Sequence, residues 1–104
     1  MKTEKLEAME ARYLSIEDQL SDPSVIANQN KWRELSKEHA ELSEIISKFR
    51  EYKKVMQQCQ DARDILGDNT MKDLHDLAKE DLKTGEEEVE RLEKEIHILL
   101  IPKD

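Results

Sequence analysis

The sequence of 104 residues is poor in residues that interrupt helices and in residues that form disulfides. It has two glycines, two prolines and one cysteine, and aromatic residues make up 4% of it. A β-sandwich or a β-barrel needs turn residues about every 8–12 positions, so this composition excludes both folds. A single cysteine cannot form an internal disulfide, which is typical of a protein kept in the reducing cytoplasm.

Long apolar runs and an excess of positive charge are missing as well. No apolar run approaches the roughly 18 residues that a membrane-spanning helix needs, so we expect no contact with a membrane. Three of the first five residues are charged, and they lead into a charged helical pattern, so they predict no apolar signal segment. With 17 basic and 25 acidic residues the formal charge is −8, which argues against a protein that mainly neutralises nucleic-acid phosphates.

Helix-forming residues dominate the chain instead. Ala, Glu, Lys, Leu and Arg make up about half of it, which is the composition of long helices and coiled coils. Apolar residues recur at alternating spacings of three and four, in stripes that begin at Leu6, Trp32 and Met71. The sequence therefore predicts an all-α protein with helices at about residues 3–20, 24–66 and 70–100.

Capping residues mark the start of the first two predicted helices. Thr3 is a candidate N-cap for the first, and Asp22 precedes Pro23 as N-cap and first residue of the second. The polar residues 28–30 then interrupt the second segment, either as a kink or as the cap of a long helix.

Residues 67–70 predict the turn between the second and third helices. Gly67 suits the left-handed position after a helix, and Thr70 followed by Asp73 resembles a capping box. Such a short link makes two long helices antiparallel neighbours. A turn centred between residues 68 and 69 places Gly85 opposite Tyr52 and residue 78 opposite residue 59.

We expect the short first helix to fold back onto the first half of the second helix. The last turns of the third helix end in the same region. The prediction is a single helical domain over residues 1–104, with a three-helix bundle at one end and a two-helix, coiled-coil-like hairpin at the other.

No set of residues in the sequence indicates catalysis, a metal site or a cofactor. The three histidines, His39, His75 and His97, are far apart, and no second ligand lies at metal-binding spacing. Cys59 lies on an apolar stripe without a neighbouring His or Lys to activate it. Acidic residues on the third helix are best explained as a solvated face, so we predict that this chain is not an enzyme by itself.

One basic cluster interleaves with aromatic residues on the second helix. It could contact an RNA backbone or an acidic protein. The alternative, which we favour, is pairing with the acidic residues 86–90 of the third helix, which the hairpin places nearby. The cluster consists of Lys48, Arg50, Lys53 and Lys54, beside Phe49 and Tyr52.

Three motifs, in order along the chain, carry a more specific resemblance. They are the Ser21-Asp22-Pro23 turn, the run from Leu35 to Leu42 (LSKEHAEL), and the exit from Leu99 to Asp104 (LLIPKD). Together with Tyr13 and the segment from Trp32 to Glu34, these motifs resemble the N-terminal domain of the bacterial peptide chain release factor 1 family. The final Pro-Lys-Asp is more similar to the type 1 than to the type 2 factors.

This resemblance implies a class I factor of translation termination. Members read UAG or UAA codons with a Pro-Xaa-Thr tripeptide and promote peptidyl-tRNA hydrolysis with a Gly-Gly-Gln motif. Neither motif is in this chain, because Pro23 is followed by Ser24 and Val25 and no two glycines adjoin. The codon-reading and Gly-Gly-Gln domains are thus absent from this chain, and the resemblance transfers no catalytic residue to it.

The role that the resemblance implies is docking, by a cytoplasmic and monomeric domain, near the stalk base of the large ribosomal subunit. The GTPase release factor is a second implied partner, and stop-codon mRNA is contacted only through the absent domains. The candidate contacts are the basic cluster and the hairpin tip, Gly67, Asp68, Asn69 and Thr70. A stand-alone coiled-coil adaptor remains the alternative, and such an adaptor would dimerise through its own apolar stripe.

Overall fold

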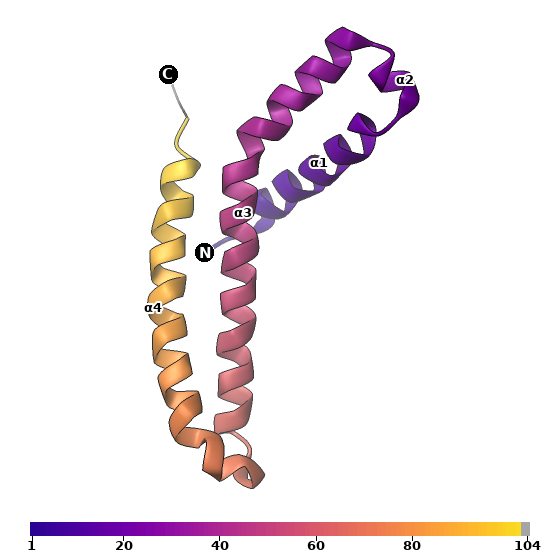
Figure 1. Cartoon of the computed structure of the whole chain (residues 1–104). Helices are drawn as coiled ribbons and strands as arrows, with labels where there is room; N and C mark the ends of the chain where they lie inside the picture. The colour runs from indigo at the N-terminus through magenta and orange to yellow at the C-terminus, as the bar shows by residue number, and fades with distance from the viewer. Residues whose placement is uncertain (103–104) are drawn as a thin grey trace. The chain divides into compact units, whose positions relative to one another are not determined.

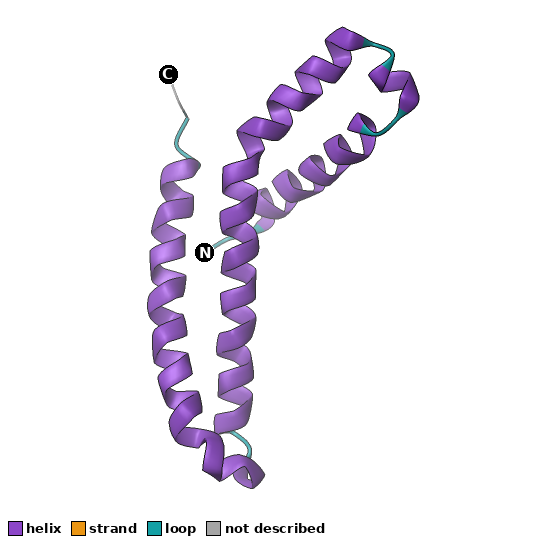
Figure 2. Ribbon diagram, viewed as in Figure 1, coloured by secondary structure: helices purple, strands orange, loops and turns teal. Residues whose placement is uncertain are grey.

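Every element of the protein is helical in the computed structural model, which describes residues 1–102 (Figure 2). The described residues contain no strand, so the all-α class is confirmed. In chain order (Figure 1), the elements are α1 (Glu4–Leu20), α2 (Pro23–Ile26), α3 (Gln29–Leu66), the 3₁₀ helix η1 (Asn69–Leu74) and α4 (His75–Leu99).

The chain forms two compact units, and helix α3 belongs to both. The first unit is Met1–Ser47, and the second begins at Lys48. The first unit contains α1, α2 and the first half of α3, and the second contains the rest of α3 with η1 and α4. The single domain and the three-helix bundle stay predictions.

The first unit is held by the apolar stripe of α1. Ile16 is fully buried and packs with Val25 of α2 and Leu35 of α3, and Leu20 and Leu42 cover this cluster. These residues come from three helices, and their burial supplies most of the stability of such a small unit. The periodicity of the first stripe is therefore confirmed as a buried helix face.

Caps position the short helix α2 between its neighbours. Asp22 Oδ1 accepts hydrogen bonds from Ser24 N at 2.9 Å and from Ser24 Oγ at 2.8 Å, and Pro23 is the first residue of α2, as predicted. Asn28 Oδ1 accepts from Lys31 N at 3.2 Å, so the interruption is the cap of a long helix. Thr3 occupies the N-cap position of α1, but its side chain makes no capping hydrogen bond.

Polar contacts clamp α1 against α3 within the first unit. The Arg12 guanidinium donates two hydrogen bonds to the Glu38 carboxylate, at 2.6 and 2.7 Å. Tyr13 and His39 stack with ring centroids 4.3 Å apart. Trp32 Nε1 donates to Leu20 O at 3.3 Å. His39 thus has a structural role in this unit.

The second unit is a hairpin in which α4 runs antiparallel beside the later part of α3 (Figure 1). Large side chains fill its core at one end, where Phe49, Leu92 and Ile96 are fully buried. Small buried residues take their place closer to the turn, among them Cys59, Ala62 and Ala78. Small residues allow two helix backbones to approach closely. The antiparallel arrangement of α3 and α4 confirms the predicted long hairpin.

Gly85 of α4 packs directly against α3. A Cβ at this position would lie 2.5 Å from Cys59 Sγ and 4.0 Å from Val55 Cγ1, so a larger residue would require the sulfur or a backbone to move. The predicted pairing of Gly85 with Tyr52 is therefore wrong, and residue 78 is displaced from Cys59 by the same shift. The reason is the length of the turn, because α3 ends at Leu66 and α4 begins only at His75.

The turn differs from the prediction in its backbone conformation and in its capping residue. Gly67 does not take a left-handed conformation. Asp68, and not Thr70, is the N-cap, and it starts a 3₁₀ helix instead of α4. A 3₁₀ helix has three residues per turn, so the apolar stripe loses its register there. Met71 and Leu74 consequently remain exposed at 40% and 41%, although periodicity placed them on the buried stripe.

The contact between Gly85 and Cys59 predicts the effect of adding a methyl group at position 85. Alanine is the better helix former by about 1 kcal/mol, yet we expect Gly85→Ala to destabilise the hairpin, because overpacking costs about 1–3 kcal/mol. Urea unfolding followed by circular dichroism measures the difference. In a Cys59→Ala background the same substitution should be neutral or stabilising, because the obstructing sulfur is gone. Equal effects of Gly85→Ala in both backgrounds would contradict the close contact.

Candidate docking surface

The basic cluster on α3 divides into engaged and exposed side chains. Lys48 Nζ lies 3.1 Å from Glu95 Oε2 of α4, and the Lys48 side chain is 32% exposed. Lys53 Nζ lies over the Phe49 ring, 4.6 Å from its centroid. Pairing of the cluster with acids of the third helix is thus confirmed for Lys48. Its partner is Glu95, outside the expected range of residues 86–90, because of the longer turn.

Two other members of the cluster reach the solvent. Arg50 and Lys54 are exposed, and Lys53 is half-buried. Within the part of the chain that the structure describes, Lys54 makes no ion pair. The face of α3 around Lys54 therefore offers positive charge that α4 does not neutralise.

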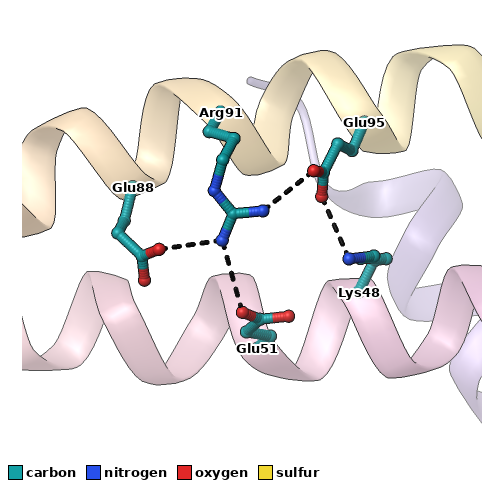
Figure 3. A network of polar contacts seen from close by, with 5 residues as sticks. All are labelled: Lys48, Glu51, Glu88, Arg91 and Glu95. Atoms are coloured by element: carbon teal, nitrogen blue, oxygen red, sulfur yellow. Dashed lines mark hydrogen bonds and ion pairs between the residues drawn. The ribbon is translucent and has the colours of Figure 1, made fainter.

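A network centred on Arg91 joins α4 to α3 (Figure 3). Arg91 donates to Glu88 Oε1 and to Glu95 Oε1, each at 2.8 Å, along its own helix. It also reaches Glu51 Oε1 of α3 at 3.5 Å. Through Glu95 and Lys48 the network returns to α3, so it crosses the hairpin twice.

Sequence reasoning missed Arg91, although part of the signal was available. The spacings from Glu88 to Arg91 and from Arg91 to Glu95 are three and four residues, which bring side chains together on one helix face. The contacts with Glu51 and Lys48 depend on how α3 and α4 align. They could not be identified without the correct length of the turn.

The network shifts the pKa values of Glu95 and Arg91 in the direction that favours their charged forms. The hydrogen bond from Lys48, followed by that from Arg91, holds the pKa of the Glu95 carboxyl below its ordinary value of 4.5. The carboxylates of Glu88 and Glu95 raise the pKa of the Arg91 guanidinium. All these groups are partly exposed, so solvent screens them and the network determines alignment more than stability.

The hairpin tip is a hydrogen-bonded, solvent-facing turn. Asp68 Oδ1 accepts from Thr70 N at 2.9 Å and from Thr70 Oγ1 at 2.6 Å. These two bonds hold the pKa of the Asp68 carboxyl below its usual range. His75 Nε2 lies 3.0 Å from the carbonyl oxygen of Asp68 and ties the start of α4 to the turn. Gly67, Asn69 and Thr70 are exposed.

The tip and the basic cluster are separate parts of one unit. The cluster lies within α3, and the tip follows the last residue of that helix. Exposed apolar side chains continue from the tip into α4, where Leu77 is 57% exposed. Sequence reasoning missed this feature, because the 3.6-residue periodicity assigned Met71 and Leu74 to the buried face.

Residues 1–102 contain no group of three or more His, Cys, Asp or Glu side chains that could hold a metal ion. Cys59 is a buried free thiol whose sulfur packs against Gly85. Within the same residues, each helix is too short or too polar to cross a membrane.

The chain is similar to known proteins over nearly its whole length. Residues 9–104 match the PCRF domain family. The chain is 43% identical to Peptide chain release factor 1 of Caldicellulosiruptor saccharolyticus, 45% to that of Clostridium novyi and 46% to that of Pelobacter propionicus. Each comparison covers 97% of this chain but 28% of the relative, so the chain spans less than a third of the length of these relatives. No solved structure matches the chain significantly.

The Arg91 network predicts a stability that depends on salt. We expect Arg91→Met to lower the melting temperature more in low salt than in 1 M NaCl, where the Debye length falls to about 3 Å. Lys94→Met is the matched control, because among the described residues Lys94 pairs with Glu90 alone, at 3.5 Å on the same exposed helix face. Thermal melts of both variants at the two salt concentrations measure the difference. Equal losses for both variants would show that the network does not join the helices.

Proposed function

Because the chain belongs to the PCRF domain family, we propose that it is the docking domain of a bacterial release factor that directs translation termination at UAG and UAA codons. The observation that carries this proposal is the 43–46% identity to three proteins named Peptide chain release factor 1. The proposed partner is the ribosome, at the stalk base of the large subunit, with the GTPase release factor as a second partner.

The geometry of the second unit suits a docking role. Two helices held in alignment by buried side chains and by the Arg91 network make a stiff arm, and the Asp68 cap orders its tip. In this proposal, the tip residues 67–70 and the exposed face around Lys54 contact the ribosome. The chain itself performs no catalysis in this proposal and acts in the cytoplasm.

The distribution of apolar side chains favours a monomer over a coiled-coil adaptor that dimerises. An adaptor of that kind would need its apolar stripe for a second copy. In this chain the stripe is used internally, since Phe49, Leu92 and Ile96 are fully buried within the second unit. We therefore propose that the domain is monomeric when it docks.

The experiment that tests the proposed function is to sequence the source reading frame beyond Asp104. We expect the frame to continue into a segment that contains Pro-Xaa-Thr and then Gly-Gly-Gln, since the relatives are more than three times as long. A stop codon directly after Asp104 would contradict the assignment to a termination factor and favour a free-standing helical adaptor.

The role of the basic face can be tested in the intact factor. We expect the double variant Lys53→Glu and Lys54→Glu to slow association with ribosomes several-fold at low salt, because rim charges mainly change association rates. Stopped-flow fluorescence with labelled ribosomes measures the rate. The control is Lys79→Glu with Lys83→Glu, which changes the charge equally on the exposed face of α4. Equal rates for the two double variants would contradict a contact at the basic face.

A further inference from the structure

A groove with a mixed polar and apolar lining runs between α3 and α4 in the second unit, beside Leu77. Its volume is about 620 Å³. Its floor includes Val55 of α3, and Leu77 and Gly85 of α4. Val55 is buried, but the Leu77 side chain is 57% exposed. Gly85 contributes no side chain to this lining, and Leu77 gives it an apolar side chain that the described residues leave largely uncovered.

Carboxylates surround this floor. Asp61 of α3 and three acids of α4, Glu80, Asp81 and Glu88, line the groove, and no lysine or arginine is among its described lining residues. Glu88 also pairs with Arg91, so Asp61, Glu80 and Asp81 supply the available negative charge. Glu80 and Asp81 are exposed and make no ion pair within the part of the chain described. The groove therefore places the apolar side chains of Val55 and Leu77 beside carboxylates, and its described charged lining residues have one charge sign.

The neighbouring face of α4 has a different character. Lys79 and Lys83 lie there among the acids Glu86, Glu87 and Glu90, so charges of both signs are mixed. The single-sign rim is thus specific to the groove and does not follow simply from the acidic composition of α4.

We propose that this groove binds a basic amphipathic helix of a protein partner, with an apolar residue on Leu77 and lysine or arginine side chains on the carboxylate rim. Helix-in-groove recognition uses this combination of apolar anchors and flanking charge. From Leu77 to Glu88 the groove follows α4 for roughly 16 Å, which is about three turns of a helix. The rim repels nucleic-acid phosphates, and it repels a second copy of this chain, whose charge is −8.

This inference goes beyond the proposed docking on the ribosome and does not depend on it, because its test contains no ribosome. The probe is an 18-residue synthetic peptide helix with leucine on one face and lysine on the other. It is titrated into the ¹⁵N-labelled 104-residue chain. We expect amide shifts to concentrate at Val55, Leu77 and Gly85, and a peptide with the same residues in scrambled order to bind at least several-fold more weakly.

Charge reversal tests the location of the site. Glu80→Lys with Asp81→Lys should weaken binding of the peptide by about tenfold, because it places like charges in contact. Glu87→Lys with Glu90→Lys makes the same change of charge on the neighbouring face and should weaken it by less than about twofold. All four positions are exposed, so circular dichroism should show unchanged helix content in both variants. Leu77→Ser should also weaken binding, and Leu77→Met should preserve it.

Four outcomes would overturn the proposal. Equal losses in the two charge-reversal variants would show attraction to overall charge without a site. Equal affinity for the scrambled peptide would exclude a helix face as the ligand. Competition by a 12-nucleotide RNA would point to phosphate as the ligand. A dimer of the chain in sedimentation that Leu77→Ser dissociates would show that a second copy covers the groove.

Discussion

The contact between Gly85 and Cys59 is the constraint on which the hairpin depends. At this point a methyl group on α4 would meet the sulfur at 2.5 Å, so the absence of a side chain lets Cys59 pack against the α4 backbone. A glycine inside a helix is unfavourable by about 1 kcal/mol relative to alanine. The burial of Cys59, Val55 and Ala78 around this contact offsets that cost.

The alignment set by this contact decides which charges meet. It brings Lys48 to Glu95 and Glu51 to Arg91, and it leaves Lys54 exposed on α3. The same alignment places Asp61 of α3 across from the acids near Leu77, with no base between them. A shift of α4 by two turns would exchange these partners, so both the network and the groove follow from the packing at Gly85.

Lowering the pH should weaken the Arg91 network. The pKa of Glu95 is lowered in the folded chain, mainly by Lys48 and then by Arg91. The stabilisation that Glu95 contributes is therefore present above its ordinary pKa of 4.5, and it is lost as the pH falls from there through the lowered pKa of the folded state. Because the carboxylate is accessible to solvent, this contribution is small beside the buried apolar core.

Residue spacing, helix-capping residues and turn residues by themselves determined the helical class, the apolar face of α1, the cap at Asp22 and the antiparallel pairing of the long helices. These features depend on local geometry, in which side chains three and four residues apart share one face. The ordered motifs also indicated the release factor resemblance. Only the tertiary structure decided the start of α4, the partner of Gly85, the Arg91 network and the exposure of Leu77. A side-chain bond from Asp68 to Thr70 extended the turn by a 3₁₀ helix, and a turn of different length moves every contact between the helices that it joins.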